Sequence, residues 1–432
     1  MASILSILIF VVALILIFSE KVQRAIVATV AAALMVGVGI IFGFYSEQDA
    51  IDAIDFETLG LLMGMMLLVV LLQQTGFFEY LAIMAGRLSG GNPIRLFILL
   101  GTITTVLSMF LDNVTTVVLI APVTILICEL LSINPIPMLI GEALLSDTGG
   151  AGTLVGDPPN ILIGAAAPFT FNDFLTHSLP VVVVAWLLAL LLLLWLFRHD
   201  LRPNPGAAEA VNKLDPSKAL HNPQSARRVL IVLGIAILFF FLHQTLPLSP
   251  AFIALAAAGG ALLWVRPENV SETFERIEWV VLVFFSALFV MVGALEAVGV
   301  MERLSQLIIQ VSDANPILLG VGMIWSVAIL SALVDNIPIT IALIPVIRNL
   351  GAEGLDVTPL WWALVFGAGF GGNGTIIGST ANIVVVSLSE KTRSPITAGI
   401  WNRRGLPVMI LACTVASVLF AIFFPWFTEN AR

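Results

Sequence analysis

Residues 108–122 read SMFLDNVTTVVLIAP, and residues 331–345 read SALVDNIPITIALIP. Each stretch holds an Asp-Asn pair, Asp112-Asn113 and Asp335-Asn336, in the middle of an apolar run. An ionised carboxylate at the centre of a bilayer costs about 3 kcal/mol or more unless it is paired or faces water, so such residues are functional by default. We expect each pair to form the tip of a re-entrant hairpin, because irregular backbone at that depth must be covered by protein. The structural alternative is that Asp112 only caps the following helix.

The composition places these hairpins in a lipid bilayer. Of 432 residues, 59% are apolar and 11% are charged, and the mean hydropathy is +1.06, whereas about a quarter of the residues of a soluble domain are charged. The apolar blocks are about 20 residues long, which suits a spanning helix and not a barrel strand. We therefore predict an all-α polytopic membrane protein with spans at 2–18, 25–44, 58–75, 177–197, 229–246, 249–265, 279–297 and 405–425.

The motifs exclude several classes of function. Cys128 and Cys413 lie in apolar runs without metal-ligand spacing, so neither a disulfide framework nor a metal site is expected. No Lys follows the glycine string GAGFGGNG in a phosphate-loop arrangement, and no basic stripe suits a nucleic acid. An aspartic protease needs two touching carboxyls, which a duplicated hairpin does not require. We expect no enzyme, and no cofactor beyond a proton or sodium gradient.

Basic residues indicate the orientation of the spans. Two further apolar regions, 93–170 and 316–390, are broken by polar, Gly and Pro clusters. If each span crosses once and each broken region is a hairpin plus a crossing, all 19 Lys and Arg residues except Arg303, Arg348 and Arg432 fall on one side. Loops rich in Lys and Arg stay in the cytoplasm. The polar segment 198–228 is therefore predicted to lie inside the cell, and the protein to be a multi-pass protein of the cell (inner) membrane.

The two halves of the chain match at a nearly constant offset. Asp112-Asn113 precedes Asp335-Asn336 by 223 residues, and Asn160 precedes Asn382 by 222. This duplication predicts an extra span at 1–24, a first repeat at 25–197, a cytoplasmic linker at 198–228, a further span at 229–248 and a second repeat at 249–432. Because the first repeat begins inside the cell and the second outside, the repeats are expected to be inverted. Inverted repeats with interrupted helices are typical of secondary transporters, although a duplication without transport is the alternative.

Each repeat also holds an apolar span interrupted by glycines. These spans are LLSDTGGAGTLVGDPPNILIG (144–164) and FGAGFGGNGTIIGSTANIVVV (366–386). Glycine runs and Pro158-Pro159 break a helix, and unwound backbone is tolerated only where it lines a cavity or is covered by protein. Tight packing through small residues explains the glycines but not the polar residues. Together with the hairpin tips, we expect a solute site formed by Asn113, Thr153, Asn160, Asn336, Thr375, Ser379 and Asn382.

Four carboxylates are candidates for coupling the solute to a proton or ion gradient, namely Asp112, Asp335, Asp157 and Asp147. The hairpin tips and the unwound segments carry no Lys or Arg. An organic dianion would therefore lack countercharge unless sodium supplied it. The remaining solutes are a small cation, a proton or a small neutral hydroxylated molecule.

On these motifs the chain resembles a known group of transporters. The tips LDNVTT and VDNIPIT, with GGAGTLVGDPPN and GGNGTIIGSTAN, are similar to those of the ion transporter superfamily. The branch is that of arsenite permeases (ArsB-type), NhaD-type sodium/proton antiporters and the melanosomal P protein, and the resemblance covers nearly the whole chain from about residue 25. Members that carry divalent anions have Ser-Asn-Thr at the tips, whereas this chain has Asp-Asn-Val and Asp-Asn-Ile. This difference argues against a dicarboxylate as the solute. The resemblance implies a homodimer with a scaffold domain and a transport domain that moves as an elevator.

Within this branch we expect export of arsenite or antimonite in exchange for protons. The neutral trihydroxide suits a cage of Asn, Thr and backbone groups, and Asp112 and Asp335 suit proton exchange. Sodium/proton antiport is the alternative, because carboxylates, carbonyls and hydroxyls are hard oxygen ligands. A sodium-coupled anion transporter, a channel and an intramembrane protease are less favoured. The expected partners are the small inorganic solute or a sodium ion, the lipid bilayer, a second copy of the chain and, as one option, an ATPase subunit on the basic linker.

Overall fold

A computed structural model describes residues 2–18, 21–202, 211, 215–243, 245, 246, 248–303, 305, 306, 315–392 and 395–429. Every regular element assigned in these ranges is a helix, as the composition predicts. Much of the predicted linker, residues 203–210 and 212–214, lies outside the described residues, as do residues 307–314 of the second half.

The helices recur in the same order in the two halves of the chain. The first half contains α2 (Arg24–Phe42), α3 (Glu47–Asp52), α4 (Phe56–Gln73), α6 (Pro93–Ser108), α7 (Asn113–Leu131), α8 (Ile136–Gly150), α9 (Pro158–Ala166) and α11 (Leu179–Leu196). Their counterparts are α14 (Pro250–Val265), α15 (Val270–Glu275), α16 (Trp279–Ala297), α18 (Pro316–Leu333), α19 (Asn336–Ala352), α20 (Thr358–Gly371), α21 (Thr380–Ser389) and α22 (Ala398–Ile422). Outside this matched set lie α1 (Ala2–Phe18), α5 (Phe77–Leu88), α13 (Pro223–Leu242) and the short elements α10 (Phe171–Asp173), η1 (Phe174–Ser178), η2 (Pro216–Lys218), η3 (Gly372–Gly374), η4 (Ile376–Gly378) and α23 (Phe424–Thr428).

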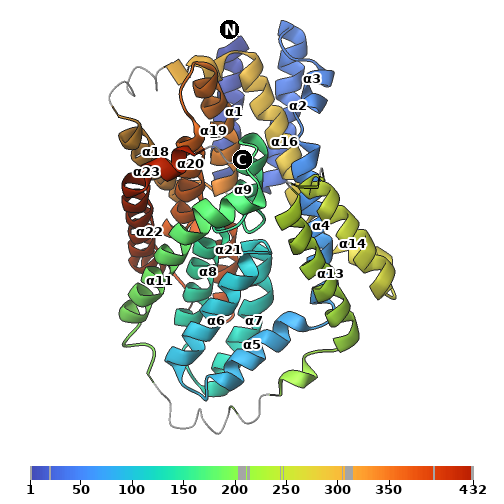
Figure 1. The fold of residues 1–432 in the computed structure, drawn as a ribbon, viewed down its shortest axis with the longest axis vertical. Coiled ribbons are helices and arrows are strands. Elements are labelled where there is room, and N and C mark those ends of the chain that lie inside the picture. Colours follow the sequence, from blue (N-terminus) through green and yellow to red (C-terminus); the bar gives the residue numbers. More distant parts are fainter. Residues whose placement is uncertain are drawn as a thin grey trace.

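The helices pack as two groups. One group contains α1, α2, α4, α13, α14 and α16, in which α4 packs on α14 and α2 packs on α16. The other group contains α6 to α11 and α18 to α22, in which α6 packs on α8 and α18 on α20. The two repeats interlock within this second group, because α7 packs on α21 as well as on α8, and α19 packs on α9 as well as on α20. Figure 1 shows the α6–α7 pair in the lower half of the molecule and α18 and α19 in the upper half.

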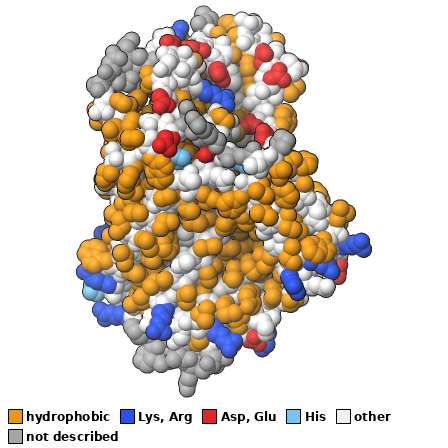
Figure 2. All heavy atoms as spheres, in the orientation of Figure 1, with side chains coloured by type: hydrophobic (Ala, Val, Ile, Leu, Met, Phe, Trp, Pro, Cys, Tyr) orange, Lys and Arg blue, Asp and Glu red, His pale blue; other side chains and the backbone are white. Residues whose placement is uncertain are grey.

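The described helices include eight that are long and apolar enough to cross a bilayer, so the chain is a multi-pass membrane protein. Figure 2 shows a broad band of hydrophobic side chains around the middle of the visible face, with most of the visible Asp and Glu side chains above it. Two predicted spans, α1 and α14, are shorter apolar helices of 17 and 16 residues. The last span begins at Ala398, before the predicted start at 405, because the polar residues ahead of the apolar window continue its helix.

Candidate functional site

The two interrupted helices are held open by the same brace. After α8, the side-chain amide of Asn160 donates hydrogen bonds to the carbonyls of Gly150 (3.0 Å) and Thr153 (2.8 Å). After α20, Asn382 donates to the two matching carbonyls at 2.9 and 3.0 Å. Unwound backbone leaves carbonyls without helical partners, and each Asn side chain supplies one. The sequence predicts both residues at the solute site, whereas their amide groups bind the loop backbone.

The same loops are attached to the hairpins. The hydroxyl of Thr153 donates to the carbonyl of Met109, at the end of α6, and Thr375 donates to Ala332, at the end of α18. The tips are therefore positioned by Thr153 and Asn160 in the first repeat and by Thr375 and Asn382 in the second. None of these four residues lines the cavity described below. This arrangement fixes the hairpin tips against the breaks of the interrupted helices.

A close approach of backbones explains one matched pair of glycines. A Cβ atom on Gly156 would lie 2.5 Å from the carbonyl oxygen of Gly150 and 2.8 Å from that of Ser108. At the matching position, a Cβ atom on Gly378 would lie 2.6 Å from the carbonyl oxygen of Gly372. All three distances are shorter than real Cβ contacts, so only glycine lets the backbone approach this closely at these two positions.

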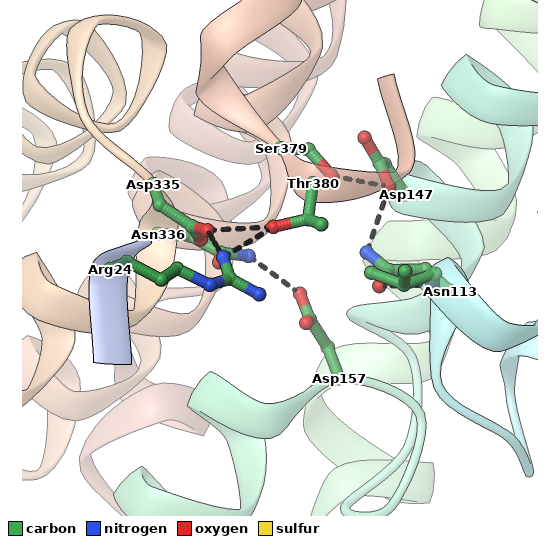
Figure 3. Close-up of polar contacts among 9 residues, drawn as sticks. Arg24, Asn113, Asp147, Asp157, Asp335, Asn336, Ser379 and Thr380 are labelled. Atoms are coloured by element: carbon green, nitrogen blue, oxygen red, sulfur yellow. Dashed lines mark hydrogen bonds and ion pairs between the residues drawn. The ribbon is translucent and has the colours of Figure 1, made fainter. Parts of the chain in front are cut away.

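The Asn of each tip binds a buried carboxyl group (Figure 3). Asn113 donates to Asp147 Oδ1 (2.8 Å), and Ser379 donates to the same oxygen at 3.2 Å. Asn336 donates to Asp157 Oδ2 at 3.0 Å. The fold therefore brings together five of the predicted residues, from both repeats, and Asp147 and Asp157 are each 2% exposed.

The two tip aspartates face other partners. Asp112 caps α7 by accepting from the Thr115 amide (3.1 Å) and hydroxyl (3.2 Å), so the capping role considered for it is present. Asp335 makes no such cap. Instead, it forms an ion pair with Arg24 Nη1 at 2.6 Å and accepts from the Thr380 hydroxyl at 2.9 Å.

Arg24 brings a positive charge that the motifs do not contain. It begins α2, which belongs to the first packing group, and it also donates to Thr380 Oγ1 at 2.6 Å and lies 5.3 Å from the centre of the Phe284 ring. The hairpin tips and the breaks carry no basic residue, as the sequence shows. The expectation that the site therefore lacks a positive charge is wrong, because Arg24 reaches it from α2. Arg24 is 311 residues from Asp335, and a basic residue before a span predicts only a cytoplasmic loop.

A second contact joins the two packing groups at the other tip. The hydroxyl of Thr115, in the first turn of α7, lies 3.0 Å from Glu278 Oε1, and its single proton can be donated either to Glu278 or to Asp112. Glu278 immediately precedes α16. Each hairpin tip thus contacts a charged residue of the first packing group.

A cavity of about 350 Å³ lies between the tips and the first packing group. Its polar wall includes Asn113, Asn336, Ser379 and Thr380, and its apolar wall includes Leu62, Met65, Met66 and Val69 of α4. The charged lining residues are Asp112, Asp157, Glu278, Asp335, Arg24 and Arg276. Arg24 is paired with Asp335, and Arg276 with Glu272 outside the cavity at 2.7 Å. Carboxylates therefore outnumber guanidinium groups in this lining.

No set of three or more His, Cys, Asp or Glu side chains suited to a metal ion occurs in the described ranges. Cys128 and Cys413 are both buried in helices, and neither lines the cavity. Neither thiol is therefore placed to bind a solute in this cavity.

Comparison with known proteins identifies relatives over the whole length. Residues 14–367 match the family described as CitMHS, citrate transporter. The chain is 38% identical to an uncharacterized transporter of Mycobacterium tuberculosis, Rv2685, over 96% of this chain and 97% of that protein. It is 33% identical to the human P protein over 93% of this chain and 57% of the longer P protein.

The fold is similar to that of a solved transporter. The crystal structure of the Alcanivorax borkumensis YdaH transporter matches with a TM-score of 0.59 at 15% identity, over 98% of each chain. At that identity the similarity concerns the fold alone.

Proposed function

This chain belongs to the citrate transporter (CitMHS) family of the ion transporter superfamily and is a secondary transporter, not an enzyme, and we propose that it exports arsenite or antimonite in exchange for protons. The observation that carries this proposal is the pairing of Asn113 with Asp147 and of Asn336 with Asp157. Among the described side chains, the buried carboxyl groups of Asp147 and Asp157 have amide and hydroxyl partners and form no ion pair with Lys or Arg. Each can hold a proton at low energetic cost, because a neutral carboxyl group avoids the penalty of a buried charge.

The composition of the cavity supports a neutral solute. Arsenite and antimonite are uncharged trihydroxides near neutral pH, and Asn113, Asn336, Ser379 and Thr380 offer donors and acceptors for hydroxyl groups. A tricarboxylate such as citrate would face a lining with more acids than bases, in which Arg24 is already paired. The acidic excess favours sodium/proton exchange as the second candidate, because sodium is a hard cation that prefers oxygen ligands.

The architecture supports an elevator motion of two inverted repeats. The matched order of helices and the position of the hairpins in opposite halves of the molecule are what an inverted duplication produces. We assign α1, α2, α4, α13, α14 and α16 to the scaffold domain and α6 to α11 with α18 to α22 to the transport domain. The domain boundaries, the homodimer and an ATPase partner on the basic linker remain predictions.

Purified protein in liposomes tests the solute directly. With the lumen more acidic than the bath, we expect radiolabelled arsenite to accumulate inside, because protons leaving the lumen drive it in. Sodium should not dissipate the gradient, and citrate should not accumulate. Dissipation by sodium without arsenite uptake would replace the proposal with sodium/proton exchange, citrate uptake would replace it with anion transport, and arsenite equilibration without accumulation would indicate a channel.

A further inference from the structure

Buried polar side chains link α7 and α8 at two levels. At the tip of the hairpin, Asn113 binds Asp147. Farther from the tip, the Thr124 hydroxyl donates to Glu142 Oε1. Glu142 is 0% exposed, it does not line the cavity, and no ion pair found among the described residues includes it. A buried carboxyl group this deep is unexplained by the site described above.

Two further hydroxyl groups lie between these levels. The helices α7 and α8 are consecutive, in contact and joined by residues 132–135, so they run antiparallel. Along α7, Thr116 lies between Asn113 and Thr124, and along α8, Ser146 lies between Glu142 and Asp147. Both hydroxyls are 0% exposed, and neither has a hydrogen-bond partner in the part of the chain that the structure describes. The second carboxyl oxygens of Glu142 and Asp147 also lack one there.

The second repeat shows that the fold does not require these polar groups. Its helices α19 and α20 form the matching pair. At the positions equivalent to Thr116, Thr124, Glu142, Ser146 and Asp147 it has Ile339, Ile347, Leu364, Ala368 and Gly369. Each unsatisfied buried polar group costs about 1–3 kcal/mol, so the first repeat carries a penalty that the second avoids.

From this contrast we propose that Glu142, Thr116 and Ser146 form a proton pathway from the far end of the α7–α8 pair to Asp147, separate from the solute cavity. The proposal rests on proton coupling as part of the proposed function. At that end, Glu129 and Asn134 are exposed. Six residues of helix, about 9 Å, separate the start of α8 from Glu142, and about 7.5 Å separates Glu142 from Asp147. That second distance is too long for direct transfer; Ser146 lies within this stretch of α8, and Thr116 lies on the neighbouring helix α7.

The transfer conserves protons at each group. Because neither hydroxyl is hydrogen-bonded to Glu142 or Asp147 in the described structure, each step follows a side-chain rotation that brings a hydroxyl within reach of a carboxyl oxygen. A protonated Glu142 then gives its proton to a hydroxyl oxygen, and that hydroxyl passes its original proton to the open oxygen of Asp147. Each hydroxyl ends with one proton, and Glu142 is reloaded from the exposed end. Cys128 and Glu129 of α7 are the other titratable groups on this part of the pair, and Cys128 is close enough to interact with Glu142.

The second repeat also supplies the test variants. In liposomes, Glu142→Leu and the double variant Thr116→Ile/Ser146→Ala should lower accumulation of arsenite driven by a pH gradient tenfold or more. Exchange of labelled for unlabelled arsenite at equal pH needs no net proton movement and should stay within twofold of the parent. Glu390→Gln, which alters an exposed carboxyl group, should change neither rate. Full gradient-driven accumulation of arsenite by Glu142→Leu would overturn the pathway. A variant that loses both arsenite exchange and gradient-driven accumulation would overturn it too.

A second measurement separates this proposal from the choice of solute. If the parent protein carries no arsenite, the proposed function fails, but infrared spectroscopy of the protein in lipid still tests the pathway. We expect a protonated carboxyl band that Glu142→Gln removes and that shifts in heavy water as its proton exchanges. A spectrum without that band, or a band that never shifts, would overturn the proposal whatever the solute.

Discussion

Arg24 is the residue on which the two packing groups meet most directly. It comes from α2, and its guanidinium binds both Asp335 and Thr380 at the second hairpin tip. The side chains of the ion pair are 25% and 14% exposed, so water screens part of their attraction. We therefore expect the pair to contribute little to the stability of the fold and to act mainly on the relative position of the two packing groups.

We predict an interaction energy of about 1 kcal/mol between Arg24 and Asp335. Thermal unfolding of Arg24→Gln, Asp335→Asn and the double variant in detergent would measure it as a double-mutant cycle. Each single variant should also slow arsenite transport, because the remaining charge is left without its partner. Strictly additive effects on unfolding would show that the pair contributes no interaction energy.

Asp112 allows capping and coupling to be separated. Ser caps a helix about as well as Asp, so Asp112→Ser should keep the start of α7 intact and leave the unfolding temperature nearly unchanged. We predict that proton-driven transport nevertheless falls tenfold or more, because the carboxylate beside Glu278 is lost. Unchanged transport in this variant would mean that Asp112 only caps the helix.

At the scale of elements, the braces at Asn160 and Asn382 decide the shape of the interrupted helices. Asn382→Ala removes two hydrogen bonds to buried carbonyls, and we expect a loss of about 1–3 kcal/mol of unfolding free energy. Thr414→Ala is the matched control, because that exposed hydroxyl binds only the carbonyl of Ile410 in its own helix (2.7 Å). Thermal unfolding in detergent compares the two variants. Equal stability would contradict the brace.

The elements themselves could be predicted from the sequence. Apolar windows of spanning length predict most of the spans, but two of the eight span-length helices of the described residues, α7 and α18, lie outside the predicted spans. The Asp-Asn pairs and glycine runs predict where α7 and α19 begin and where α8 and α20 end. The direction of individual side chains could not be predicted: an Asn in an unwound segment can bind either a solute or the loop backbone, and Asn160 and Asn382 do the second. Arg24 was missed because no local pattern connects it with a residue 311 positions away.

At the scale of the whole molecule, the proposed elevator motion requires the two packing groups to move past each other. Thr115 and Glu278 join them through a hydrogen bond of 3.0 Å. In a background without Cys128 and Cys413, Thr115→Cys/Glu278→Cys should lose transport when a short thiol-specific cross-linker is added and recover when a cleavable linker is cut. Each single Cys variant with the same reagent is the control. Full transport by the cross-linked protein would exclude an elevator motion at this contact.

The most direct test of proton exchange at the paired carboxyl groups is the pH of the lumen during solute efflux. Liposomes that contain the protein, arsenite and a pH-sensitive dye would be diluted into arsenite-free buffer at the same pH. As arsenite leaves, we predict that the lumen acidifies in the parent protein and does not in Asp147→Asn/Asp157→Asn. Protein-dependent arsenite efflux at constant lumenal pH, or equal acidification in both proteins, would contradict the mechanism.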